Sequence, residues 1–70
     1  MIKTVLIDDE VNNTIYLQGL LQEHFTEVDI AGAATNAVDG ETLLKELQPQ
    51  LVFLDVEMPG TTGFELLQKM

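Results

Sequence analysis

The sequence predicts an α/β fold built on a three-stranded parallel sheet in the order 2-1-3. Two short apolar runs, residues 3–7 and 51–54, are continuous rather than alternating, which is typical of strands covered on both faces. Segments with helical spacing alternate with the strand-like segments in a β-α-β-α-β-α pattern. Because crossovers between parallel strands are right-handed, the first strand is expected at the centre of the sheet.

The first predicted strand covers residues 3–7, which are rich in β-branched side chains. Residues 11–24 are predicted to form the first helix. Its apolar residues share one broad arc of the helix surface, although Gln18 and Gln22 interrupt that arc. The arc predicts the buried face of the helix, which comprises Val11, Ile15, Leu17, Leu21 and Phe25.

The second predicted strand, residues 28–33, is weaker than the first because an aspartate and a glycine dilute it, as an edge strand tolerates. Thr35 or Asn36 is then placed to cap a second helix over residues 37–47. Gly40 is expected to weaken this helix. Its apolar residues follow helical spacing and predict the buried face: Ala37, Leu43, Leu44 and Leu47.

Residues 51–54 form the third predicted strand, residues 60–63 a flexible turn, and residues 64–70 the start of a third helix. No linker or repeat divides the chain, so 70 residues predict one small domain with a limited core. The third strand would lie at an edge with unpaired backbone groups, which natural sheets cover or pair. We therefore expect self-association, most simply a two-fold dimer through this strand.

Twelve acidic residues against three lysines give a formal net charge of −9. This charge repels nucleic acids and anionic membrane surfaces, so no direct nucleic-acid binding by this chain is expected. The N-terminus lacks the charged region and long apolar core of a signal peptide, and no apolar run approaches the roughly 20 residues of a membrane-spanning helix. The expectation is a cytoplasmic protein with no membrane association.

Carboxylates follow two of the predicted strands at the points where those strands end. Asp8 and Asp9 follow the first strand, and Asp55 follows the third. Because the C-terminal ends of neighbouring parallel strands meet at one edge of a sheet, we expect the three side chains to converge. In a partly desolvated pocket at least one of several close carboxylates would hold a proton at neutral pH unless a cation compensates, and Mg²⁺ prefers oxygen ligands of this kind. The sequence therefore predicts a Mg²⁺ site, with the main-chain carbonyl of Glu57 placed to complete it.

With Mg²⁺ present, one carboxylate can act as a nucleophile toward phosphorus and form an acyl phosphate. Asp55 is the candidate because it ends its strand, whereas Asp8 and Asp9 form a pair better suited to holding the ion. A structural alternative is that these residues only cap a helix or form a turn. That alternative explains each acid separately but gives no reason for three to converge.

Three other functional interpretations are weighed against this one. In the first interpretation, the chain is an inert structural fragment or a self-associating interaction module without phosphoryl chemistry. A phosphatase-like hydrolase also uses a nucleophilic aspartate after an apolar strand, but Glu57 stands where such enzymes usually carry a second aspartate. A nucleotide-binding module is weaker still, because Asp-Asp-Glu follows the first strand where phosphate-cradling glycines are needed.

Three segments carry a family resemblance: residues 7–10 (Ile-Asp-Asp-Glu), residues 52–60 (Val-Phe-Leu-Asp-Val-Glu-Met-Pro-Gly) and residues 63–67 (Gly-Phe-Glu-Leu-Leu). With the spacing between them, they closely resemble the receiver domain of two-component response regulators, over the whole chain. Within the last two segments, residues 57–60 and 63–66 look most like receivers attached to LytTR-type DNA-binding domains, which act in transcription regulation.

The resemblance implies a flavodoxin-like (CheY-like) fold and phosphorylation of Asp55 by a sensor histidine kinase. It implies Mg²⁺ held by Asp8, Asp9, Asp55 and the main-chain carbonyl of Glu57. It further implies a signalling module that changes conformation when phosphorylated. Such a module catalyses at most its own phosphorylation and dephosphorylation and is not a metabolic enzyme.

The resemblance also implies five strands, so residues 1–70 are expected to be a partial receiver domain whose second half is absent. The family's hydroxyl residue after the fourth strand, lysine after the fifth strand and switch aromatic then have no counterpart. No lysine in the chain replaces the missing one, since Lys3 opens the first strand while Lys45 and Lys69 belong to helices. We therefore expect impaired switching.

Overall fold

The computed structural model describes residues 1–55, 57–58 and 61–62. Its main sheet has three parallel strands in the order β2-β1-β3. These strands are β1 (Ile2–Ile7), β2 (Val28–Ala34) and β3 (Leu51–Leu54). The predicted parallel sheet and its order 2-1-3 are therefore confirmed.

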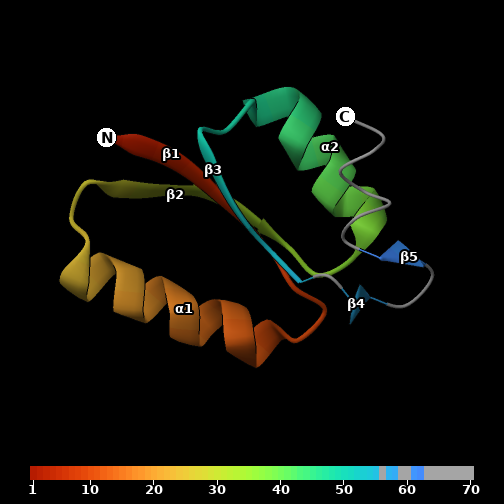
Figure 1. Ribbon diagram of the computed structural model, residues 1–70, viewed down its shortest axis with the longest axis horizontal. Coiled ribbons are helices and arrows are strands. Elements are labelled where there is room, and N and C mark those ends of the chain that lie inside the picture. Colours follow the sequence, from red (N-terminus) through yellow and green to blue (C-terminus); the bar gives the residue numbers. More distant parts are fainter. Residues whose placement is uncertain (56, 59–60, 63–70) are drawn as a thin grey trace.

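The two helices of the described part lie on opposite faces of this sheet (Figure 1). α1 (Val11–His24) connects β1 to β2, and α2 (Ala37–Leu47) connects β2 to β3. The opposite placement follows from right-handed crossovers, because the chain steps from β1 to β2 in one direction and then returns past β1 to β3. Both helices have the bounds that the apolar spacing predicts.

The core is centred on β1, the middle strand. Val5, Leu6 and Ile7 are at most 1% exposed to solvent. Val5 and Ile7 pack with Leu44 of α2, whereas Leu6 points to the α1 face, since successive side chains of a strand alternate between faces. The continuous apolar run in the sequence thus reflects a strand with a helix over each face.

The predicted buried face of α1 is confirmed only in part. Leu21, which it included, is buried, and so is Thr14, which it did not include, while Val11 and Ile15 are 53% and 60% exposed. Phe25, just beyond the helix, is 50% exposed. The apolar arc is too broad to identify which of its residues contact the sheet. The buried positions are Thr14 and Leu21, seven residues or about two helical turns apart. The methyl group and satisfied hydroxyl of Thr14 explain why a polar residue fits there, because its Oγ1 donates to the carbonyl of Val11 at 2.7 Å.

The N-terminus of α2 is capped by Asn36, one of the two residues predicted for this role. Its Oδ1 accepts a hydrogen bond from the backbone N–H of Asp39 at 2.8 Å. Its Nδ2 donates to Oδ2 of the same aspartate at 2.9 Å. The cap fixes the start of the helix that covers β1 and β2.

Gly40 has a packing role that propensity alone does not reveal. It is buried, and a Cβ at this position would lie 2.9 Å from Cδ1 of Ile7. The glycine therefore allows α2 to approach the central strand closely. The point of contact is Ile7, the residue directly before Asp8. Its unfavourable helix propensity, about 1 kcal/mol relative to alanine, is offset by this contact.

The segment after β3 departs from the predicted flexible turn. Thr61–Thr62 forms the short strand β5, which pairs antiparallel with β4 (Glu57–Met58). The two strands are separated in sequence by Pro-Gly, a dipeptide that favours chain reversal over a short distance. The third helix, expected over residues 64–70, lies outside the described residues.

Candidate functional site

The C-terminal ends of β1 and β3 are neighbours in the sheet. Ile7 is paired with Leu54, so Asp8 and Asp55 follow side by side. Hydrogen bonding continues past the strands, because the N–H of Asp55 donates to the carbonyl of Ile7 at 2.9 Å. On the other side, the N–H of Asp8 donates to the carbonyl of Ala34 at 3.1 Å. The backbone therefore holds both aspartates at the same edge of the sheet.

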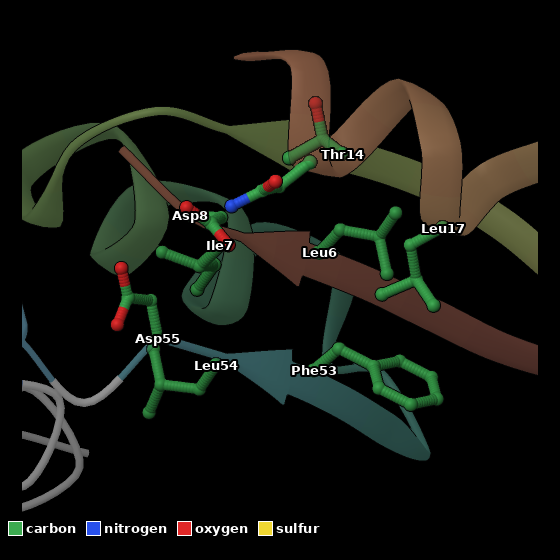
Figure 2. Close-up of a pocket in the computed structure, with 9 residues that line it drawn as sticks. Leu6, Ile7, Asp8, Thr14, Leu17, Phe53, Leu54 and Asp55 are labelled. Carbon is green, nitrogen blue, oxygen red and sulfur yellow. The ribbon is translucent and has the colours of Figure 1, made fainter. Parts of the chain in front are cut away.

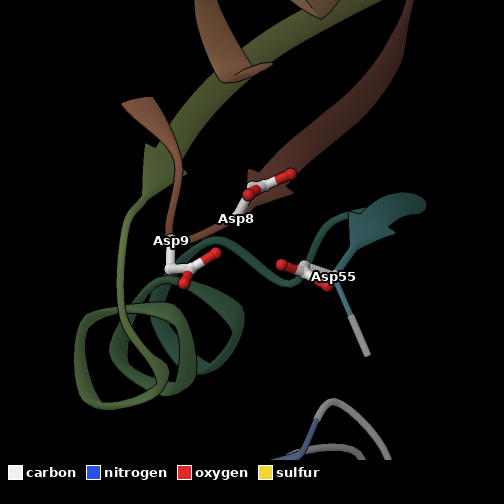
Figure 3. A group of neighbouring side chains, drawn as sticks. All are labelled: Asp8, Asp9 and Asp55. Atoms are coloured by element: carbon white, nitrogen blue, oxygen red, sulfur yellow. The ribbon is translucent and has the colours of Figure 1, made fainter. Parts of the chain in front are cut away.

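Three carboxyl groups meet at this edge (Figure 3). Asp8, Asp9 and Asp55 each offer one carboxylate oxygen, and these oxygens all lie within 4.8 Å of one another. Asp8 and Asp55 are half-buried, and Asp9 is exposed. The expected convergence of the three side chains is therefore present in the structure.

The proximity of the three acids affects the protonation of Asp9. Partial desolvation raises its pKa, and a hydrogen bond to the carboxyl of Asp55 adds to the increase. Repulsion from the charges of Asp55 and Asp8 acts in the same direction. The cluster thus carries more negative charge than its surroundings compensate, which is the electrostatic condition that favours cation binding.

The capping alternative is not supported at α1. Glu10 occupies the N-cap position, and no side chain caps the helix there. Asp8 instead accepts a hydrogen bond from the N–H of Glu10 on Oδ1 at 2.9 Å, the pattern of an Asx turn. This bond uses one carboxylate oxygen of Asp8 and orients the group beside Asp55.

The donor set fits a hard divalent cation. All three side chains offer oxygen, the ligand that Mg²⁺ prefers, and one or two carboxylates usually suffice because the ion retains several waters. His24 lies at the C-terminal end of α1, whereas the cluster lies just before the N-terminal end of this helix, so His24 is not part of the donor set. A zinc site of the nitrogen-rich type is therefore disfavoured at this edge.

Glu57, the fourth residue predicted to take part, begins β4 two positions after Asp55. The participation of its main-chain carbonyl stays a prediction. The segment from 57 to 58 belongs to the antiparallel β4–β5 pair and not to the main sheet.

A cavity of about 230 Å³ opens beside the carboxylates, between α1 and the sheet (Figure 2). Asp8 and Asp55 lie at one end of it, and Leu17 and Phe53 lie toward the other. Sequence reasoning missed two residues of its wall, Asn13 and Thr14, which come from the first turn of α1. Their place in the sequence could have indicated this position, because they lie four to six residues after Asp8 and Asp9, in the helix that starts at the site.

The model of one protein family, the response regulator receiver domain, matches residues 4–70. This chain belongs to the receiver domain family. Receiver domains are signalling modules of two-component systems, so the family assignment agrees with the resemblance carried by residues 7–10, 52–60 and 63–67. The LytTR subclass is a finer assignment than this match provides.

Curated relatives and solved structures agree with the family. The chain is 43% identical over 70 residues to an uncharacterized response regulatory protein of Vibrio vulnificus, covering 100% of the chain and 28% of the relative. It is 37% identical over 67 residues to the transcriptional regulatory protein BtsR of Escherichia coli, covering 96% and 28%. The chain thus spans less than a third of these relatives.

The receiver fold is confirmed by the response regulator domain of Thermotoga maritima CheB. The two structures superpose with a TM-score of 0.88 at 24% identity, over 97% of this chain and 50% of the CheB chain. Within the described part of the chain, neither helix is long and apolar enough to span a membrane.

Proposed function

We propose that this chain is a phospho-accepting module in which Asp55 receives a phosphoryl group from a sensor histidine kinase. Mg²⁺ is held by Asp8, Asp9, Asp55 and the main-chain carbonyl of Glu57. The observation that carries the proposal is the convergence of three carboxylate oxygens within 4.8 Å at the ends of β1 and β3. Membership of the receiver domain family supports the same chemistry. A cytoplasmic location, where a kinase partner would meet the chain, is part of the proposal.

Asp55 is the proposed nucleophile because it directly follows β3 and its carboxyl group faces Asp8 at the cavity (Figure 2). A carboxylate oxygen of Asp55 forms an O–P bond with the phosphoryl group of the kinase's phosphohistidine. The P–N bond breaks, and its electron pair remains on the imidazole nitrogen. Asp55 therefore ends the reaction as an acyl phosphate.

The other two acids hold the ion, and Asp9 makes its binding depend on pH. Asp8 is fixed by its hydrogen bond from Glu10, and Asp9 gives up the proton that its raised pKa favours. When bound, Mg²⁺ supplies positive charge that offsets the repulsion between the carboxylates and the phosphoryl oxygens.

Two lysines, Lys3 and Lys45, belong to the described residues, and both make contacts elsewhere in the fold. The Nζ of Lys3 donates to the carbonyl of Leu47 at 3.1 Å, and that of Lys45 pairs with Glu41 at 2.9 Å. Among the described residues, both lysines are thus engaged away from Asp55. We therefore propose that a phosphoryl group on Asp55 is bound by groups other than these two lysines.

The test is intact-mass spectrometry of the chain after incubation with a small acyl phosphate, with and without Mg²⁺. We expect one added phosphoryl group only when Mg²⁺ is present, and none on the Asp55→Asn variant. A folded wild-type chain that gains no phosphoryl group with Mg²⁺ would support the competing interpretation, an inert structural or interaction module.

We also propose that the chain self-associates through β3. This strand ends the main sheet, and no described strand pairs with its outer edge. Beside it lies an apolar groove of about 470 Å³, whose lining includes Leu17, Leu21, Leu51 and Phe53. Exposed strand edges and apolar surfaces of this kind favour association.

A two-fold antiparallel pairing of β3 suits the charge of the chain. Centred on Val52, it would place Leu51 of one copy opposite Phe53 of the other. The two Asp55 residues would then lie about 20 Å apart along the strands, so the acidic clusters would not face each other. Sedimentation equilibrium is expected to show a dimer at micromolar concentration, and Phe53→Lys to make it monomeric. A folded wild-type monomer at the same concentration would contradict the pairing.

A role in transcription regulation is the proposed output. BtsR is described as a transcriptional regulatory protein, and residues 57–60 and 63–66 resemble LytTR-type regulators. We propose that DNA binding belongs to a separate domain, because the net charge of −9 disfavours contact between this chain and DNA.

A further inference from the structure

We propose that the carboxamide of Asn13 binds the phosphoryl group at Asp55 by donating a hydrogen bond from Nδ2 to a phosphoryl oxygen. The inference rests on the proposed function and adds a binding residue to it. Asn13 belongs to none of the acidic segments that carry the family resemblance, and its assignment comes from its place in the cavity wall.

The cavity beside the acidic cluster is where Asn13 meets the site. Its wall combines Asp8 from the end of β1, Asp55 from the end of β3, and Asn13 from the first turn of α1. The N–H of Asn13 donates to the carbonyl of Glu10 at 3.1 Å, which fixes the backbone of this turn. The end of β1, the first turn of α1 and the distant end of β3 therefore place polar groups around one space of about 230 Å³.

The carboxamide of Asn13 has no hydrogen-bond partner among the described residues. The hydroxyl of Thr14, its neighbour in the wall, already donates to the carbonyl of Val11 at 2.7 Å. The remaining wall is apolar apart from Asp8 and Asp55. Asn13 is therefore the uncommitted side-chain N–H donor on the described wall of the cavity.

A donor is what the site needs when phosphorylated. Carboxylates and phosphoryl oxygens are all acceptors, and a metal ion satisfies only some of them. Lys3 and Lys45 are engaged elsewhere. A neutral amide that donates to a charged phosphoryl oxygen makes a charge-assisted hydrogen bond, which is stronger than a bond between neutral groups.

Asn12 provides a matched control for Asn13. Both are exposed asparagines in the first turn of α1, so their replacement by alanine changes helix propensity and surface polarity equally. Only Asn13 is among the residues that line the cavity. A difference between Asn13→Ala and Asn12→Ala therefore reports the cavity contact rather than a general effect on the helix.

The experiment measures three quantities on the wild-type chain and the two variants: Mg²⁺ affinity, affinity for beryllium fluoride with Mg²⁺ present, and the rate of phosphorylation by a small acyl phosphate. Beryllium fluoride mimics a phosphoryl group on a carboxylate and reports binding without group transfer. We expect Asn13→Ala to weaken beryllium fluoride binding and slow phosphorylation, each about tenfold, with Mg²⁺ affinity unchanged. Asn12→Ala is expected to stay within about twofold of wild type throughout.

The outcomes separate this inference from the function on which it rests. Wild type that binds beryllium fluoride, together with equal affinities for the two alanine variants, would overturn the role of Asn13 and leave the phosphoacceptor proposal standing. A folded wild-type chain that neither binds beryllium fluoride nor accepts a phosphoryl group would overturn both. Loss of Mg²⁺ affinity in Asn13→Ala alone would assign the residue to metal binding and contradict the proposed contact.

Discussion

The backbone N–H of Asp55 donates to the carbonyl of Ile7 at 2.9 Å. Asp55 directly follows Leu54, the residue paired with Ile7 at the end of the sheet, and Asp8 directly follows Ile7. This bond ties the two acidic segments together through the main chain. Their side chains consequently stay close although like charges repel, because the sheet and not the carboxylates determines the distance. The stability of the metal-free protein should therefore depend on how this repulsion is relieved.

Replacing Asp9 by asparagine is expected to stabilise the metal-free protein at neutral pH. The pKa of Asp9 is raised in the folded state by desolvation and by its acidic neighbours. The folded protein therefore binds this proton more tightly than the unfolded chain, and stability falls as pH rises from about 4 through the folded pKa. Thermal melting should show a higher Tm for Asp9→Asn than for wild type at pH 7, with the difference shrinking toward pH 4. A difference that grows on acidification would contradict this sign.

Mg²⁺ should reverse the order of these two proteins. Binding to the folded state raises Tm with ion concentration, and each aspartate removed weakens the site. We expect a Mg²⁺-dependent rise in Tm for wild type and a smaller one for Asp8→Asn, Asp9→Asn and Asp55→Asn. Glu46→Gln is the control, because it removes one exposed acidic charge on α2 outside the cluster. An equal loss in Glu46→Gln would show that Mg²⁺ only screens the net charge.

Gly40→Ala should destabilise the fold despite the better helix propensity of alanine. The new Cβ would lie 2.9 Å from Cδ1 of Ile7, which sits in the core. Overpacking of this kind costs about 1 to 3 kcal/mol. Gly19→Ala on α1 is the matched control, since a Cβ there has nothing within 4 Å. We expect urea denaturation to show a loss for Gly40→Ala and a gain of up to about 1 kcal/mol for Gly19→Ala. Equal effects would mean that α2 does not pack on β1 as closely as the structure has it.

Asn36→Ala is expected to cost about 1 kcal/mol of unfolding free energy, because it removes the N-cap of α2. Thr35→Ala, at the neighbouring exposed position, should have little effect. The measurement is the urea midpoint of each variant. A larger cost for Thr35→Ala than for Asn36→Ala would show that the cap lies one residue earlier.

Most of the main fold was predictable because its signals are local. The apolar run of β1, the spacing in both helices and the break after each one follow from residue type and period. The position of Asp8, Asp9 and Asp55 then follows from the strand order. Three acids after two parallel neighbours can only meet at one edge of the sheet.

Other features depend on contacts that are distant in sequence. The buried face of α1 includes Thr14 and excludes Ile15, a choice made by packing on the sheet and not by the apolar arc. The role of Gly40 depends on Ile7, which is 33 positions earlier, so helix propensity gave only its cost. Asn13 was missed because an exposed asparagine in a first turn is ordinary until the cavity beside it is known.

The central claim is that Asp55, among the three clustered acids, accepts the phosphoryl group. The most direct measurement labels the chain with a small acyl phosphate and Mg²⁺, reduces it with borohydride, and maps the modified residue by peptide mass spectrometry. Borohydride converts a phosphoaspartate to homoserine and so marks the acceptor. We predict homoserine at position 55 and unmodified Asp8 and Asp9. Homoserine at position 8 or 9 instead, or no modified residue in a folded and Mg²⁺-loaded sample, would contradict the account.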